Sequence, residues 1–153
     1  MKAINTMRLV FDSRSVNESF ARTATAAFLT SLDPTVEEIT DLKTAVSEAV
    51  TNAIVHGYRE RIGKVYITAN IYGDNRVVVK IKDTGCGIED VRQAMEPLFT
   101  TRPDQERAGL GFAVMESLTD KVKVFSQPGK GTTVVLTKKI VSKGAANEHS
   151  DGI

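Results

Sequence analysis

A carboxylate and a carboxamide lie four residues apart in one apolar segment of the chain. Glu48 and Asn52 recur at the helical interval, so both side chains share one face of the predicted helix. The amide oxygen of Asn52 suits a hard cation, and Mg²⁺ takes few protein ligands when phosphates supply the others. Glu48 is placed to take a proton from a hydroxyl or water that attacks a phosphate, or to orient it. Alone, the pair would be an ordinary polar stripe on a helix.

An acidic residue and two glycines follow an alternating apolar run, at residues 83–88 (Asp-Thr-Gly-Cys-Gly-Ile). Gly85 and Gly87 allow the backbone to turn sharply and to approach a ligand closely. Asp83, at the predicted strand end, is placed to accept a hydrogen bond from a planar NH donor such as the amine of adenine. Because Asp-Xaa-Gly also forms ordinary turns, this segment indicates a ligand-binding site only if matching segments lie elsewhere in the chain.

Two further glycine-rich segments are candidates for binding a ligand. Gly109-Leu110-Gly111 predicts a helix start whose unpaired backbone NH groups and positive dipole end would attract phosphates. After the turn at residues 127–132, either Thr132 or Thr133 could hold the base through its hydroxyl or a bound water. Arg107, just before the glycines, could place a guanidinium over the charge of the last phosphate. ATP or ADP with Mg²⁺ would use all of these groups.

Apolar periodicity predicts the elements that position these residues. Strands are expected at residues 7–11, 64–72, 76–82, 122–125 and 133–141, and helices after Ser15, at 35–56, at 89–95 and from Gly109.

Local signals predict where these helices begin and end. Ser15 with Glu18 forms a predicted capping box, and Asp33-Pro34 a predicted helix start. Gly57 is expected to end the long helix, and residues 97–108 to form a mobile loop. The first helix is expected to bury Phe20, Ala24, Ala27, Phe28 and Leu32.

This element order predicts an α+β fold, a two-layer sandwich of helices on a mainly antiparallel sheet. The 153 residues are expected to form one domain over 1–141, followed by a disordered tail over 142–153.

Composition narrows the classes of function. The net charge of +1 argues against a direct nucleic-acid partner, which usually selects a large basic excess. No apolar run is long enough to span a bilayer, so no membrane partner is expected. Cys86 is the one cysteine, which excludes an internal disulfide and fits a reducing, cytoplasmic location.

Three segments in this order resemble the conserved boxes of the GHKL ATPases and kinases. Residues 48–57 (Glu-Ala-Val-Thr-Asn-Ala-Ile-Val-His-Gly) resemble the N box, and residues 83–87 and 109–112 resemble two glycine boxes. The resemblance covers residues 9–141 and implies the Bergerat fold, with ATP held under a flexible lid. Within this superfamily, the compact length and the run at residues 52–58 resemble the anti-sigma-factor serine kinases of spore-forming bacteria.

The resemblance implies a protein that sequesters an RNA polymerase sigma factor and phosphorylates a serine of an anti-anti-sigma factor. It also implies a homodimer, with Glu48 as base, Asn52 as Mg²⁺ ligand, Asp83 as adenine contact and Arg107 as γ-phosphate contact. Arg22, on the first helix, is our candidate contact for both protein partners. The nucleotide-binding positions expected are Asn52, Asp83, Gly85, Gly87, Ile88, Thr100, Arg107, Gly109, Leu110, Gly111, Phe112, Thr132 and Thr133.

The chain departs from two branches of the superfamily. Histidine kinases usually have asparagine in place of Glu48, and neither His56 nor His149 lies in a helical acceptor domain. Gyrase-like and Hsp90-like machines need a further domain to use hydrolysis. Two alternatives stay open, a nucleotide-gated binding module without phosphotransfer and a stand-alone ATPase.

Overall fold

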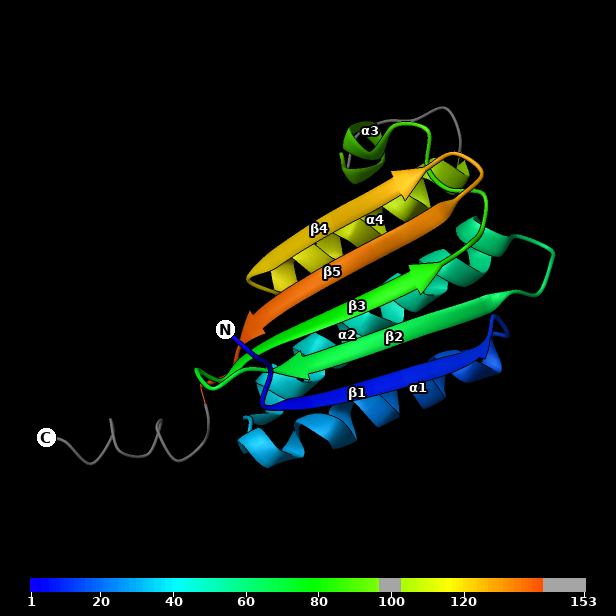
Figure 1. Ribbon diagram of the computed structural model, residues 1–153. Coiled ribbons are helices and arrows are strands. Elements are labelled where there is room, and N and C mark those ends of the chain that lie inside the picture. Colours follow the sequence, from blue (N-terminus) through cyan, green and yellow to red (C-terminus); the bar gives the residue numbers. More distant parts are fainter. Residues whose placement is uncertain (97–102, 142–153) are drawn as a thin grey trace, which may run out of the picture.

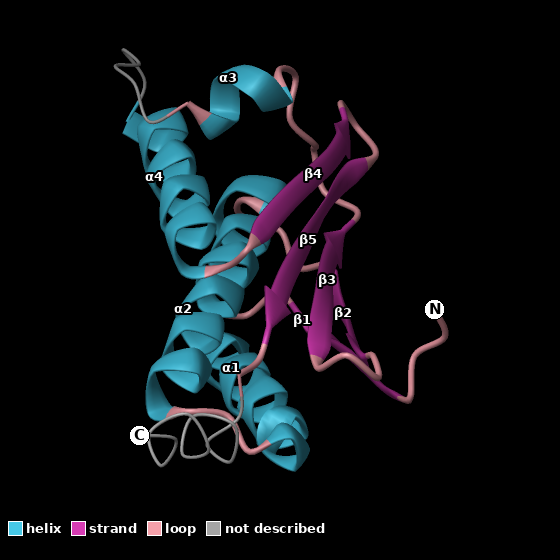
Figure 2. Cartoon of the chain, turned by 90° about the vertical axis from the view of Figure 1, so that its left-hand side faces the viewer, coloured by secondary structure: helices cyan, strands magenta, loops and turns pink. Residues whose placement is uncertain are grey.

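The computed structural model describes residues 1–96 and 103–141, without the side chains of 103–108. Five antiparallel strands form one sheet in the order β1-β2-β3-β5-β4. They are β1 (Asn5–Asp12), β2 (Lys64–Ile71), β3 (Arg76–Asp83), β4 (Lys121–Gln127) and β5 (Gly131–Lys139). Helices α1 (Val16–Leu29), α2 (Val36–Asn52) and α4 (Pro103–Leu118) cover one face and leave the other open (Figures 1 and 2). The predicted two-layer α+β fold is confirmed.

The core lies between the helices and the inner face of the sheet. In β2 and β3 every second residue is buried, which is the pattern of an antiparallel sheet with one solvated face. Val65, Ile67, Val79 and Ile81 are among these buried side chains. The predicted hairpin between the two strands is confirmed, and Asn75 turns it with a φ of 63°.

The predicted start of α1 after Ser15 is confirmed, but its capping box is wrong, and so is the predicted helix start at Asp33-Pro34. Ser15 is the N-cap residue but makes no side-chain cap, and the Glu18 carboxylate accepts a hydrogen bond from Ser47 instead of reaching back. Asp33 ends the short 3₁₀ turn Thr30–Leu32 in a left-handed conformation. The capping box lies at Thr35 and Glu38, and α2 begins at Val36.

The buried face of α1 also differs from the prediction. Phe28 and Leu32 pack against the core as predicted, whereas Phe20 is 53% exposed and Ala27 faces solvent. The fully buried residues of α1 are Ala21, Thr25 and Leu29. Thr25 can be buried because its hydroxyl donates to the carbonyl oxygen of Ala21. Small residues therefore allow α1 to pack closely on α2.

The end of α2 is not the predicted glycine cap. The α-helix ends at Asn52 and continues as a π-helical segment, η2 (Ala53–Tyr58), with Gly57 buried inside it. The wider π turn breaks the four-residue interval, so His56 does not continue the line of Glu48 and Asn52.

Helix α4 begins six residues earlier than predicted, at Pro103 instead of Gly109. Proline is favoured in the first helical turn, which fits a helix that begins at Pro103. Gly109 and Gly111 therefore lie inside α4, and their backbone NH groups do not form a helix start. A short helix, α3 (Val91–Met95), agrees with the predicted one at residues 89–95. The predicted tail at residues 142–153 lies outside the described residues.

Candidate nucleotide site

Asp83 lies at the end of β3 with its side chain turned toward the helices. The residue is only 5% exposed, and its Oδ1 accepts a hydrogen bond of 2.9 Å from the backbone NH of Gly85. Burial raises the pKa of this carboxyl, while hydrogen bonds from the backbone NH groups of Gly85 and Thr132 act in the opposite direction. These two NH donors hold the carboxylate in one orientation, as a fixed acceptor requires.

Two glycines allow the chain to close around Asp83. A Cβ atom on Gly57 would lie 2.9 Å from the Cγ of Asp83, and one on Gly85 would lie 2.1 Å from the carbonyl oxygen of Gly57. Cys86 then donates its backbone NH to that same oxygen at 2.8 Å. The wide turn of η2 and the glycine turn after β3 are thus packed backbone against backbone.

The glycine turn is also tied to the β4–β5 hairpin. Ile88 donates its backbone NH to Ser126 Oγ at 2.8 Å, and Ser126 Oγ lies 2.8 Å from Thr132 Oγ1. Gly87 has a φ of 73°, and a Cβ there would lie 2.0 Å from the carbonyl oxygen of Gln127. Ser126 was missed from the sequence because its role depends on strand pairing with Thr132.

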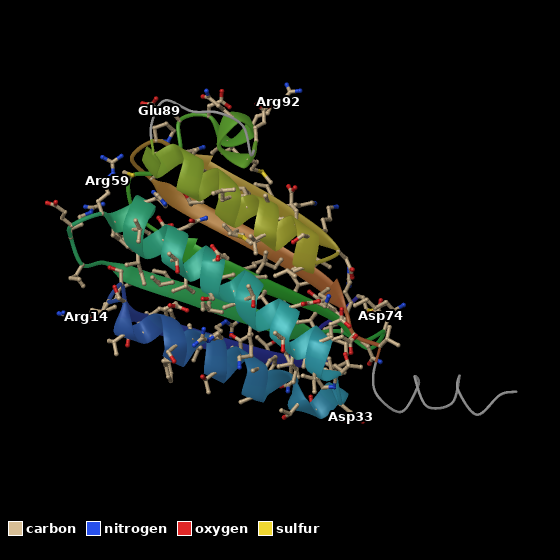
Figure 3. All side chains as sticks on the ribbon, turned by 180° about the vertical axis from the view of Figure 1, so that it is seen from behind. Arg14, Asp33, Arg59, Asp74, Glu89 and Arg92 are labelled. Atoms are coloured by element: carbon tan, nitrogen blue, oxygen red, sulfur yellow. The ribbon has the colours of Figure 1, made fainter. Side chains whose placement is uncertain are left out.

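Tyr58 is a second residue that the sequence did not single out. Its buried hydroxyl donates to the carbonyl oxygen of Lys64, accepts from the backbone NH of Thr84 at 2.8 Å and lies 3.1 Å from Thr84 Oγ1. A single side chain at the end of η2 therefore fixes both the start of β2 and the residue after Asp83. Figure 3 shows Arg59, the next residue, at the same end of the molecule as Glu89 and Arg92.

Glu48 and Asn52 meet Gly111 where α2 packs against α4. A Cβ on Gly111 would lie 3.2 Å from Glu48 Oε2 and 3.3 Å from Asn52 Nδ2. The Nδ2 atom of Asn52 is buried and has no hydrogen-bond partner within the described part of the chain. Because buried donors are normally paired, this amide fits a site that a polar ligand completes. The carboxylate, the amide oxygen and this donor suit a phosphate group with its Mg²⁺ ion.

Strand register separates the two candidate threonines. Thr132 pairs with Asp83 and shares its side of the sheet, whereas Thr133 pairs with Lys82 and faces the open side. Thr132 can therefore share a ligand with Asp83 on the inner side, whereas Thr133 borders the same pocket from the open side.

The remaining candidates lie on or before α4. Phe112 is 1% exposed and belongs to the core, Leu110 is 53% exposed, and Gly109 packs near the carbonyl oxygen of Glu96. Arg107 lies in α4, but its side chain is outside the described residues, as is the whole of Thr100.

A model of the histidine kinase-like ATPase domain matches residues 11–138. The chain belongs to the histidine kinase-like ATPase family. Its relatives include the anti-sigma F factor of Thermoanaerobacter pseudethanolicus, 57% identical over 93% of this chain and 99% of the relative. The anti-sigma F factor of Clostridium acetobutylicum is 54% identical over 88% of this chain and 94% of the relative. The family identity makes this a nucleotide-binding domain of the kinase-type ATPase class.

Solved structures share the fold of this histidine kinase-like ATPase domain. The RsbU and RsbW domains of a Mycobacterium tuberculosis protein align with a TM-score of 0.65 at 20% identity, over 89% of this chain and 32% of that one. A histidine kinase domain from a blue-light activated kinase of Erythrobacter litoralis aligns with a TM-score of 0.54 at 19% identity, over 80% of this chain and 60% of that one.

Within the described residues, no helix is both long and apolar enough to span a bilayer.

Proposed function

We propose that this chain is an ATP-dependent serine protein kinase that also sequesters an RNA polymerase sigma factor. The name anti-sigma F factor, carried by relatives that match nearly end to end, supports the sigma partner. The second partner is an anti-anti-sigma factor, which is phosphorylated on a serine. The protein acts in the cytoplasm as a homodimer.

Each side chain has one task in this proposal. Asp83 accepts the exocyclic amine of adenine, and Thr132, beside it, holds the same base. The amide of Asn52 binds the phosphate end of the nucleotide, its oxygen toward Mg²⁺ and its NH₂ toward a phosphate oxygen. Bound Mg²⁺ supplies charge neutralisation of the phosphates. Arg107 adds a positive charge near the γ-phosphate.

Glu48 completes the chemistry from the same helix face as Asn52. Its carboxylate accepts the proton of the attacking serine hydroxyl, whose oxygen forms the new bond to the γ-phosphorus as the bond to ADP breaks. Phosphoryl transfer depends mainly on position and charge, so a carboxylate held against Gly111 is a sufficient base.

The observation that carries the proposal is the unpartnered, buried Nδ2 atom of Asn52 at the contact of α2 with Gly111. A helix face that served only packing would bury an apolar side chain here, because an unsatisfied amide donor costs about 1–3 kcal/mol.

The Glu48→Gln variant tests the proposal, because glutamine keeps the size of the side chain and cannot take up the proton. We expect normal binding of ATP by calorimetry and loss of at least a hundredfold in phosphoserine formation on the antagonist, measured with labelled ATP and mass spectrometry. Glu37→Gln, an exposed position on the same helix, is the matched control and keeps full activity.

Other outcomes select the alternatives. An unchanged cycle of partner binding and release in Glu48→Gln would show a nucleotide-gated binding module. Phosphate release by the unsubstituted protein without any labelled acceptor would show a stand-alone ATPase.

A further inference from the structure

The open face of the sheet concentrates positive charge on the half formed by β3, β5 and β4. Strand alternation and pairing place twelve side chains on this half. Six are cationic (Arg76, Lys80, Lys82, Lys121, Lys123, Lys139), six are neutral (Val78, Phe125, Gln127, Thr133, Val135, Thr137), and none is acidic. The net charge of the whole chain is only +1, because acidic residues elsewhere balance the positive charge of this half of the sheet.

The strand register arranges four of these lysines in two ranks. Lys80 and Lys82 are two residues apart on β3, and Lys121 and Lys123 are two residues apart on the edge strand β4. Lys80 and Lys123 face the same residue of β5, Val135, from opposite sides. The lysines within a rank are therefore about 7 Å apart and the ranks about 10 Å apart.

An exposed aromatic ring lies at the end of this array. Phe125 is 59% exposed and lies in the same cross-strand row as Thr133 and Lys82. These three residues line a pocket of about 230 Å³ together with Asp83, Ser126, Gln127, Lys130, Gly131 and Thr132. A planar ring, hydrogen-bonding side chains, two ammonium groups and the carboxylate of Asp83 thus border one hollow.

The four lysines carry no compensating charge. Among the described residues, none of them forms an ion pair. Asp83 follows Lys82 on β3 but lies on the inner face, and Asp120, next to Lys121, accepts from the backbone NH of Lys139 at 2.7 Å. In Figure 1 this face of the sheet is turned to the viewer, with no helix crossing it. The array of Lys80, Lys82, Lys121, Lys123 and Phe125 is called the basic sheet face below.

We propose that the basic sheet face binds single-stranded nucleic acid. Proteins that hold single strands combine a positive surface that follows the phosphates with exposed aromatic rings on which bases stack. Phe125 offers such a ring beside Lys82, and the lysine ranks extend from it along two strands. A stable protein interface fits less well, because the cores of such interfaces are depleted in lysine. A double strand would leave the ring unused.

Fluorescence anisotropy with a labelled oligothymidylate of about 20 nucleotides tests this surface on the full chain. We expect binding at low salt, with log K falling against log salt at a slope of about −3, roughly −0.7 for each of four phosphates. Replacing Lys80, Lys82, Lys121 and Lys123 together by Gln is expected to abolish binding. Each single Lys→Gln change should reduce the slope by about 0.7, whereas Lys43→Gln, on the helix side, should leave it unchanged.

The ring is tested separately from the charges. Phe125→Ala should weaken binding about tenfold and leave the salt slope unchanged, because it removes stacking and no cation. The melting temperature and ATP affinity of each variant report on folding, and both should match the unsubstituted protein.

Four results would overturn the proposal. The first three are no binding of the oligonucleotide at low salt, undiminished binding by the fourfold variant, and equal affinity for a duplex of the same length. The fourth is that the oligonucleotide does not bind, while the fourfold variant loses its binding to a purified sigma factor. The last would assign the surface to an acidic protein.

Discussion

At the scale of single residues, Asp83 shows how one carboxylate can reduce stability and serve binding. Burial disfavours its charged form and raises its pKa, so folding favours the protonated acid. The stability that Asp83 contributes is therefore present below the pKa of the unfolded chain and is lost as pH rises through the higher pKa of the folded protein. Adenine needs the opposite state, an ionised acceptor.

Asp83→Asn should separate these two effects. The amide oxygen can still accept from Gly85, and the buried charge is gone, so the ligand-free variant should unfold at a higher temperature near neutral pH. Affinity for ATP should fall by about tenfold or more, because a hydrogen bond to a charged group contributes about 1.5–3 kcal/mol. Thermal unfolding and calorimetry measure the two quantities.

The pH profile is the control for this assignment. ATP affinity of the unsubstituted protein should decline as pH falls through the raised pKa of Asp83, whereas the Asn variant should lack that decline. A variant with full affinity for ATP at every pH would remove Asp83 from the site.

At the scale of elements, the site depends on η2 and the glycine turn being held together. The Tyr58 hydroxyl is one side-chain link between them, since it bonds both Lys64 and Thr84, and the Cys86 thiol, which donates to the carbonyl oxygen of His56 at 3.1 Å, is another. Tyr58→Phe removes the hydroxyl partner of two part-buried backbone groups, a carbonyl oxygen and an NH group, and should lower the free energy of unfolding by about 1 kcal/mol. ATP affinity should fall as well, because Thr84 is the neighbour of Asp83.

Chemical denaturation and calorimetry of the variant check this prediction. Tyr72→Phe, in the β2–β3 hairpin, is the matched control and should change neither quantity. A destabilised Tyr58→Phe variant with unchanged ATP affinity would show that the hydroxyl supports folding alone.

Gly111 shows a second division between stability and function. Alanine is favoured over glycine inside a helix by about 1 kcal/mol, so Gly111→Ala should keep or raise the melting temperature. The added methyl would lie 3.2 Å from Glu48 Oε2, where it crowds the carboxylate and the amide of Asn52. Phosphotransfer should therefore fall at least tenfold, measured with labelled ATP. Ser117→Ala, on the solvent side of α4, should leave activity unchanged, and a fully active Gly111→Ala variant would contradict this view of the contact.

The sequence predicts these elements well wherever a local pattern determines them. Alternation gives the strands, and the interval between Glu48 and Asn52 places them on one helix face. Gly57 is misassigned as a helix cap. Glycine is required at this position because the Asp83 side chain approaches it closely, and Asp83 is distant in the chain. The glycines of α4 suggest a helix start, but packing of Phe112 and Met115 in the core and the earlier proline extend the helix through them. Long-range contacts of this kind leave no periodic signal.

At the scale of the whole molecule, the fold assigns different tasks to different surfaces. The proposed nucleotide site lies between the helices and the inner face of the sheet, at the end where α3 lies (Figure 2). Helix α1 is on the far side of α2 from α4 and exposes Val16 and Phe20. On this helix Arg22 lies 3.6 Å from the Glu18 carboxylate, which Ser47 of α2 holds in turn. An arginine oriented by a second helix is a suitable contact for a protein partner.

Arg22→Ala should weaken binding of both the sigma factor and its antagonist by about thirtyfold, since interface arginines commonly contribute about 2 kcal/mol. ATP affinity should not change, because α1 does not border the nucleotide site. Surface plasmon resonance with each purified partner measures the effect, and Arg8→Ala, on β1, is the control. Glu18→Gln should produce a smaller loss, because it releases the guanidinium and keeps its charge. Unchanged affinities in Arg22→Ala would assign the partner surface to another part of the molecule.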